Sequence, residues 1–378
     1  MLGIRFFFVI FIFFTVSAHS KGNEFVSIIE RAESGSTIEM EPGDYNVCST
    51  VYIKGKTDIE IIGRSGVNIK KCNSFNGEYI LSVIDSDNIS IDGISFYGLT
   101  DAKYIDENTT NIVWGEQGVL FSGTSGSSVK NSKFYNFGDA ALRITSSRSH
   151  YSGEQINSKN FRAEGNVFYN VTQVTTTHPW SKDFGGTSDI TFKNNLFYEM
   201  KGGLKLSSRK GVSNAIIEGN IFNFIHGSAI EVNYYSNVGI KDNSFSNVNK
   251  FILNVFPNSI SNVNEAIDWS GLSFIKNTVF KSRGGVRIVS DIAGELISGR
   301  YISNLIISAN KFVDVDVDVD MSLYDASNRY IINLLENEKK FIYSVVKMNS
   351  YNTSGDVSLL NVKHSANVQS LDNIELKL

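Results

Sequence analysis

The chain has 378 residues, with 35 lysines and arginines against 39 aspartates and glutamates and a formal net charge of −4. This mildly acidic balance excludes a general nucleic-acid binder, which presents a basic surface to phosphates. The 3 prolines, 31 glycines and 12% aromatic residues fit a β-rich folded protein and exclude a disordered one.

The first 20 residues are expected to be a secretory signal peptide. Arg5 precedes an unbroken apolar run, Phe6 to Phe14, and small residues follow up to Ser20. The run is too short for a typical membrane span, so we expect cleavage after Ala18 or Ser20; an uncleaved anchor is the alternative. This predicts a secreted or periplasmic protein with no membrane span.

Residues 21–58 are predicted to form an N-terminal cap and the first coil of a solenoid. Asn23 to Ala32 has apolar residues at helical spacing behind an Asn N-cap. The motif Gly-x-Thr-Ile-x-x-x-Pro-Gly-x-Tyr follows, from Gly35 to Tyr45. This combination resembles the N-terminal cap of the pectin-lyase-like superfamily, whose fold is the right-handed parallel β-helix. A solenoid end needs such a cover because it exposes apolar core and unpaired strand edges.

The two cysteines, Cys48 and Cys72, are about one coil apart in the sequence. Stacked coils place neighbouring strands about 4.8 Å apart, near the distance that a disulfide needs. A secreted protein permits the bond. A Cys48–Cys72 disulfide and two buried thiols are the two alternatives.

Residues 59–327 carry a repeated pattern that is clearest from Asp189 to Phe256. In each copy an alternating run meets an Asn, a Phe follows shortly after, and a second short alternating run closes the unit. Period two indicates strands, and a recurrence every 23 to 25 residues indicates stacked repeats. We therefore predict an all-β fold, a single-stranded right-handed parallel β-helix with a short N-terminal capping helix. Asn tolerates left-handed backbone, so we expect it there at each sharp turn. The predicted turn phenylalanines are Phe96, Phe134, Phe168, Phe197, Phe222, Phe245, Phe280 and Phe312.

Four insertions lengthen individual coils, and each contains an aromatic residue. Insertions in repeat proteins tend to gather on the binding face. Exposed aromatics there would suit sugar stacking; the alternative is that they pin their loops to the body. The insertions are Tyr97–Gln117 with Trp114, Ser147–Lys159 with Tyr151, Thr177–Ser188 with Trp180 and Pro257–Gly271 with Trp269.

The segment Val313–Asp320 alternates strictly between Val and Asp. This predicts valines in the core and four outward carboxylates, either as a solvated edge or as a calcium site. The repeat fades after about Ser327, and residues 328–378 are predicted to form the last coils and a C-terminal cap.

The strand that closes each coil alternates too, so its outward residues should stack into one column about 4.8 Å apart. The insertions would flank this strand and wall it into a groove. The predicted column contains Arg143, Thr175, Lys205, Glu231, Ile252 and Asn254, and Arg287.

These residue types favour β-elimination over hydrolysis. Inverting glycoside hydrolysis needs a carboxylate pair, whereas the column offers Glu231 alone, with Asp139, Glu154 and Asp183 in nearby turns. Elimination from a uronate needs a cation on the carboxylate, a base for the α-proton and an acid for the leaving oxygen. A cationic strip on an acidic protein also favours an anionic polymer.

The chain resembles secreted polysaccharide lyases and epimerases that act on alginate- or dermatan-like uronates, including lyases of biofilm-matrix exopolysaccharide. The resemblance implies that a Lys and an Arg do the acid–base work and that Glu and Asn residues hold calcium. We assign Lys205 as the base and Arg143 or Arg209 to neutralise the uronate or act as acid. Glu231 orients Lys205 or, with Asn233, holds Ca²⁺. The candidate catalytic residues are Lys205, Arg143, Arg209 and His178, and the candidate substrate-binding residues are Glu231, Asn254, Arg287, Trp180 and Tyr151.

The sequence therefore predicts a monomeric lyase of an acidic polysaccharide. Two alternatives remain, a glycoside hydrolase on the same fold and a non-catalytic matrix or adhesin protein that binds polysaccharide.

Overall fold

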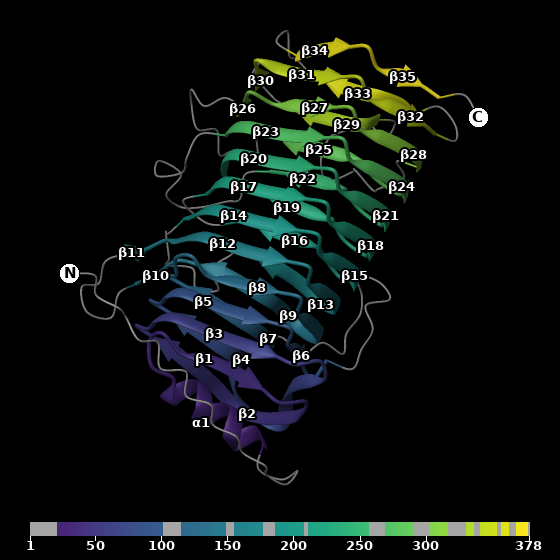
Figure 1. Ribbon diagram of the computed structural model, residues 1–378. Helices are drawn as coiled ribbons and strands as arrows, with labels where there is room; N and C mark the ends of the chain where they lie inside the picture. The colour runs from purple at the N-terminus through teal and green to yellow at the C-terminus, as the bar shows by residue number, and fades with distance from the viewer. Residues whose placement is uncertain are drawn as a thin grey trace, which may run out of the picture.

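The structure is a computed structural model, in which the chain winds into a parallel β-helix with one helix at its N-terminal end (Figure 1). No helix in the described part of the chain is long and apolar enough to cross a membrane. The predicted signal peptide lies outside the described residues. These are 21–100, 115–148, 155–176, 186–207, 211–256, 269–289, 302–316, 330–335, 341–353, 357–362 and 368–376.

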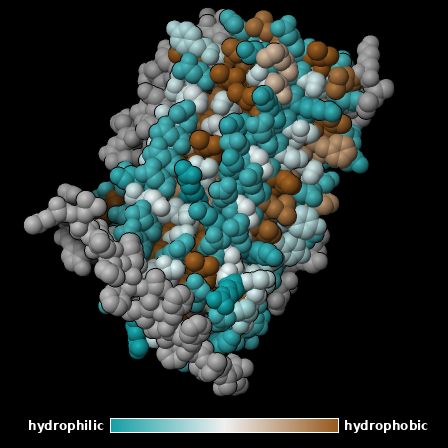
Figure 2. Space-filling view, viewed as in Figure 1, coloured by the Kyte–Doolittle hydropathy of each residue, from teal (hydrophilic) through white to brown (hydrophobic). Residues whose placement is uncertain are grey.

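Each coil contributes a strand to a first face, which is nearest the viewer in Figure 1. Its strands pair in parallel in the order β1 (Thr37–Met40), β3 (Thr57–Gly63), β5 (Asp87–Asp92), β8 (Ser128–Lys130), β12 (Ser158–Glu164), β14 (Thr187–Lys193), β17 (Val212–Glu218), β20 (Tyr235–Lys241), β23 (Ser270–Ile275), β27 (Ile306–Ser308), β31 (Ser344–Lys347) and β34 (Val368–Leu371). Two short strands, β26 (Ile302–Ser303) and β30 (Phe341–Ile342), pair beside them. Figure 2 shows that the outer surface of this face is largely hydrophilic, with scattered apolar side chains.

The second face follows along the coil and runs down the right edge of Figure 1. It consists of β6 (Ser95–Tyr97), β15 (Leu196–Met200), β18 (Ile221–Ile225), β21 (Ser244–Val248), β24 (Thr278–Ser282), β28 (Lys311–Val315), β32 (Ser350–Asn352) and β35 (Ile374–Glu375). The third face closes the coil with β7 (Gln117–Ser122), β16 (Leu204–Leu206), β19 (Ile230–Val232), β22 (Leu253–Val255), β25 (Val286–Val289), β29 (Tyr330–Leu335) and β33 (Ser358–Val362).

Four long strands bend through both the second and third faces. They are β2 (Gly43–Lys54), β4 (Val67–Ile84), β9 (Lys133–Thr145) and β13 (Val167–Thr175). A separate antiparallel pair joins β10 (Ser147–Arg148) and β11 (Gln155–Ile156). Coils thus continue to Glu375, while the predicted domain boundaries and C-terminal cap stay predictions.

The N-terminal end is covered by α1 (Lys21–Arg31). Phe25 and Ile29 are one helical turn apart and are buried, and the Phe25 ring packs edge-on against Tyr45 at 6.4 Å. The helix begins before Asn23, so the prediction that Asn23 is its N-cap is wrong.

The repeated asparagine forms a buried hydrogen-bonded ladder between the first and second faces. In each step the side-chain oxygen of one Asn accepts from both the backbone N–H and the side-chain amide of the Asn one coil earlier, at 2.9–3.1 Å. The left-handed backbone belongs to the residue before it, such as Asn194 or Asp242, so the expectation that the repeated Asn adopts it is wrong. The ladder members are Asn166, Asn195, Asn220, Asn243, Asn277, Asn310, Asn349 and Asn373.

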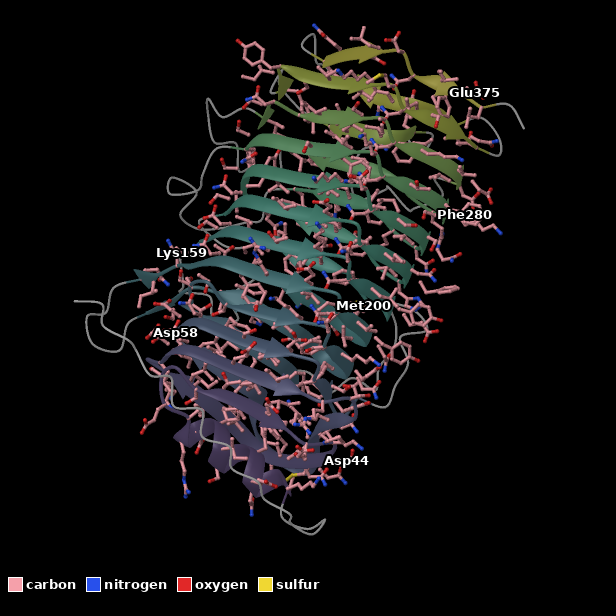
Figure 3. All side chains as sticks on the ribbon, viewed as in Figure 1. Asp44, Asp58, Lys159, Met200, Phe280 and Glu375 are labelled. Atoms are coloured by element: carbon pink, nitrogen blue, oxygen red, sulfur yellow. A yellow bond between two sulfur atoms is a disulfide. The ribbon has the colours of Figure 1, made fainter. Side chains whose placement is uncertain are left out.

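A second ladder of phenylalanine rings fills the core beside the asparagines. Phe222, for example, stacks on Phe197 at 4.4 Å and on Phe245 at 4.9 Å. Phe280 is not a member, contrary to the prediction. Val279 pairs with Phe245 instead, and Phe280 lies one position later, 43% exposed at the edge of the second face (Figure 3).

Two further predictions, for the cysteine pair and for the Val–Asp segment, can be compared with the structure. Cys48 and Cys72 are joined by a disulfide, visible beside Asp44 in Figure 3. The strict alternation expected from Val313 breaks, because Asp314 adopts left-handed backbone (φ 56°) and leaves Val313 only partly buried. Residues 317–320 of that segment lie outside the described residues.

Candidate functional site

The outward residues of the third face lie in one continuous column. Strand register pairs Arg143 with Thr175, Thr175 with Lys205, and Lys205 with Glu231. It continues from Glu231 through Asn254 to Arg287. Ile252 precedes the strand and is fully buried, so Asn254 is the column residue of its coil. Parallel pairing brings together side chains that are 23 to 33 residues apart in the sequence, even though the register between β9 and β13 shifts just before Arg143 and Thr175.

The middle of the column is an accessible ion pair. Lys205 Nζ lies 3.4 Å from Glu231 Oε2, and the two side chains are 31% and 27% exposed. A partly exposed ion pair of this kind contributes little to stability, typically below about 1 kcal/mol. Its charges are therefore available to a ligand at low energetic cost.

On the N-terminal side, Arg143 is held in a buried polar network. Its Nε donates to Gln117 Oε1 at 2.6 Å, and its Nη2 donates to Asp139 Oδ2 at 3.1 Å. Asp139 Oδ1 in turn accepts from Gln173 Nε2 at 3.0 Å. The guanidinium is thus fixed in orientation by charge-assisted hydrogen bonds.

Tyr79 belongs to the same neighbourhood, one coil before Gln117. Burial raises the pKa of Tyr79, and the positive charge of Arg143 opposes that rise. Sequence reasoning missed Tyr79, Gln117 and Gln173. The available signal was that Gln117 and Gln173 lie at or beside the start of a third-face strand, where a side chain reaches the column.

On the C-terminal side, Arg287 Nη1 donates to Asn254 Oδ1 at 2.8 Å. The guanidinium carbon also lies 5.5 Å from the centre of the Phe251 ring. Arg287 and Asn254 are only 4% and 6% exposed. The column is therefore open at Lys205 and Glu231 and buried on both sides of them.

The predicted calcium ligands do not form a metal cluster in the described part of the chain. Asn233 is buried and its Nδ2 donates to the Phe256 carbonyl, while Glu231 is paired with Lys205. Ca²⁺ takes six to eight oxygen ligands. Among the described residues no three His, Cys, Asp or Glu side chains gather in a way that could hold a metal. We therefore derive no step through calcium.

Trp269 packs against the body of the protein and does not form part of an exposed binding surface. It is 7% exposed, stacks on Tyr234 at 5.6 Å and donates from Nε1 to the Asn233 carbonyl at 2.8 Å. For this residue the pinning alternative holds. The other predicted loop residues lie outside the described residues, namely Trp114, Tyr151, Glu154, His178, Trp180, Asp183 and Arg209.

Two buried charges near the N-terminal end were also missed. Glu116 accepts hydrogen bonds from Leu99 N, Thr100 Oγ1 and Gly138 N. Lys71 is 6% exposed and donates to the Glu78 carbonyl at 2.8 Å. Burial lowers the pKa of Lys71 to about 8, although the charges of Glu116 and Glu78 oppose the change. These groups lie away from the Lys205–Glu231 pair, in the early coils.

Comparison with known proteins establishes the fold. No protein-family model and no curated protein matches the chain. The Streptococcus pneumoniae surface protein and adhesin PfbA superposes with a TM-score of 0.63 at 14% identity, over 93% of each chain. The fold is a right-handed parallel β-helix.

Two enzymes have the same architecture. A DFA-IIIase from Arthrobacter chlorophenolicus, without its lid, gives a TM-score of 0.56 at 12% identity, over 92% of this chain and 88% of that one. A GH87 α-1,3-glucanase catalytic unit from Streptomyces thermodiastaticus gives 0.53 at 10% identity, over 94% and 66%. Structural neighbours thus include carbohydrate-active enzymes and an adhesin.

Proposed function

We propose that the protein binds an acidic, uronate-containing polysaccharide along the third face and cleaves it by β-elimination at Lys205. The observation that carries the proposal is the open Lys205–Glu231 pair in a column whose neighbouring members are otherwise buried. A secreted or periplasmic monomer, with the disulfide that such a compartment permits, is part of this proposal.

In this mechanism Arg143 neutralises the uronate carboxylate. Arg143 and Lys205 are two coils apart, roughly 10 Å at the usual strand spacing, and Arg143 is only 3% exposed, so its charge would act on the carboxylate through space while the sugar unit contacts Lys205. With its charge neutralised, the carboxylate makes the α-proton acidic, and the amine form of Lys205 removes it.

The electron pair then forms a carbon–carbon double bond and expels the glycosidic oxygen, which takes a proton from an acid. Glu231 orients the Lys205 amine through the contact described above. We keep Arg209 and His178 as the candidates for the acid.

A non-catalytic binding protein is the second candidate. Both cations of the site are paired, Lys205 with Glu231 and Arg143 with Asp139, an arrangement that also suits a passive ligand surface. Hydrolysis is less favoured, because Glu231 is the one carboxylate in the column from Arg143 to Arg287, within the described residues.

The test is to incubate the purified protein with alginate, polygalacturonate and dermatan sulfate and follow the ultraviolet absorbance of the unsaturated product. We expect Lys205→Ala to abolish the rise. Lys241→Ala is the matched control, since Lys241 forms a comparable pair with Glu218 at 3.1 Å on the first face.

New reducing ends without ultraviolet absorbance would favour hydrolysis. Saturable binding without any cleavage would favour the passive surface. Full activity in Lys205→Ala would remove Lys205 from the mechanism.

A further inference from the structure

Four tyrosines lie in one row on the outer side of the second face. Strand register aligns Tyr97 with Tyr135, Tyr135 with Tyr169 and Tyr169 with Tyr198. Each follows an inward phenylalanine of the core ladder, so it must point outward, and each is partly exposed. Four consecutive coils therefore present the same aromatic, hydroxyl-bearing side chain to solvent.

The rings of this row contact one another from coil to coil. Centroid distances are 4.8 Å for Tyr97–Tyr135, 6.0 Å for Tyr135–Tyr169 and 5.7 Å for Tyr169–Tyr198. Such pairs hold each other in place, which leaves a rigid aromatic surface with little entropy to lose on binding.

Two of the hydroxyls in the row are influenced by a carboxylate. The carboxylate of Glu199 is the main cause of the raised pKa of Tyr198, and it adds to the effect of burial on the pKa of Tyr169. The row thus combines apolar ring surface with polar groups.

Phe224 adds a ring beside the row in the next coil at a conformational cost, one position after Asn223, the register partner of Tyr198. Its ring packs edge-on against Tyr198 at 5.9 Å and is 44% exposed. It has φ 54°, whereas the corresponding left-handed positions of other coils carry polar residues such as Asn170, Glu199 and Asn247. A bulky residue is rare in that region, where Asn is tolerated. The chain therefore holds an exposed aromatic ring beside Tyr198 where an asparagine would fit with less strain.

The dimensions of the row fit a single glycan chain. It spans five coils, about 20 Å, and with the neighbouring outward side chains it is only about 7 Å wide. The resulting area, roughly 150 Å², is far below the roughly 800 Å² per partner of a standard protein interface. A glycan chain is narrow, and its sugar rings offer apolar C–H faces with hydroxyl groups at their edges. The rings recur once per coil, a spacing comparable to one sugar unit of an extended glycan.

We infer that Tyr97, Tyr135, Tyr169, Tyr198 and Phe224 form a second carbohydrate-binding surface, which holds one glycan chain running along the helix axis. We call it the tyrosine row. It lies on a different face from Lys205 and Glu231, and it stands whether or not the protein cleaves polysaccharide. Its recognition groups are aromatic rings and hydroxyls, so the ligand class is a glycan bound through stacking rather than through its charge.

Affinity electrophoresis tests the tyrosine row, with native gels containing laminarin, xylan, hydroxyethyl cellulose or alginate. We expect at least one neutral polymer to retard the wild-type protein. Tyr169→Ala/Tyr198→Ala should weaken that retardation roughly tenfold or more, through the loss of two ring contacts. Tyr343→Ala is the matched control, an exposed tyrosine on the first face and away from the row, and should bind as the wild type does. Lys205→Ala should also leave binding to a neutral polymer unchanged.

Phe224→Asn keeps the test decisive if the double variant fails to fold. Asparagine already occupies the matching position in other coils, at Asn170 and Asn247, so this variant should fold normally and still bind more weakly. Three results would overturn the inference. The first is no retardation of the wild type in any gel, and the second is retardation of the Tyr169/Tyr198 and Phe224 variants equal to that of the wild type. The third is a wild-type dimer that Phe224→Asn dissociates.

Discussion

Replacing Asn220 by alanine is expected to destabilise the protein far more than a typical surface change. Asn220 is fully buried in the asparagine ladder. Its Oδ1 accepts from Asn195 N at 2.9 Å and from Asn195 Nδ2 at 3.0 Å. Its Nδ2 donates to the Phe192 carbonyl at 2.9 Å and to Asn243 Oδ1 at 3.0 Å.

The magnitude follows from the groups that lose this partner. Asn195 N–H, Asn195 Nδ2 and the Phe192 carbonyl each lose one hydrogen bond in the interior, whereas Asn243 Oδ1 still accepts from the Asn220 backbone. An orphaned buried group costs roughly 1–3 kcal/mol. The free energy of unfolding should therefore fall by about 3–6 kcal/mol, allowing for partial relief by entering water.

Asn223→Ala is the matched control, because Asn223 lies in the same coil but is only partly buried. Its Oδ1 accepts from Ser246 Oγ and Asn247 Nδ2, positions that water can replace. We expect a loss below about 1 kcal/mol there.

The assay is equilibrium unfolding in guanidinium chloride followed by circular dichroism, with amide exchange at Asn195 as the local readout. Equal losses in the Asn220 and Asn223 variants, with Asn195 still protected, would refute the reasoning that the ladder stabilises the coils.

Two further predictions concern the core and a buried charge. Phe222→Ala should lower the free energy of unfolding by about 3–5 kcal/mol, since it removes the ring between Phe197 and Phe245. Phe280→Ala, at an exposed position, should change it by less than about 1 kcal/mol. Similar melting temperatures for the two variants would contradict this prediction. For Lys71, the pKa is lowered from 10.5 to about 8 in the folded state, so between these pH values the unfolded chain binds more protons and stability rises with pH. Lys71→Met should lose that rise, a difference of up to about 3 kcal/mol across the window, and parallel stability curves for wild type and variant would disprove it.

The regular features of the fold could be predicted because they depend on alternation within one coil. The period of two places Lys205 and Glu231 outward and their neighbours inward, and equal register then stacks them. Phe280 shows where this reasoning fails. One additional residue separates it from Asn277, so Val279 takes the core position and Phe280 turns outward.

Features that depend on contacts between coils were not predictable. A local preference suggested left-handed backbone for the repeated asparagine, whereas its actual role is to bond the asparagines one coil before and after it. In the same way, nothing near Arg143 in the sequence indicates that Gln117 binds it, because the two residues meet only when the coils stack. The tyrosine row was missed for this reason too.

The asparagine ladder also bears on how such a scaffold can diversify. Successive ladder asparagines are separated by as few as 23 and as many as 39 residues, yet they make the same hydrogen bonds at 2.9–3.0 Å. Additional residues are therefore accommodated elsewhere in the coil without displacing the ladder between the first and second faces. Lengthening a loop costs little entropy. New loops can be acquired beside the Lys205–Glu231 pair while the spacing of the column is inherited unchanged.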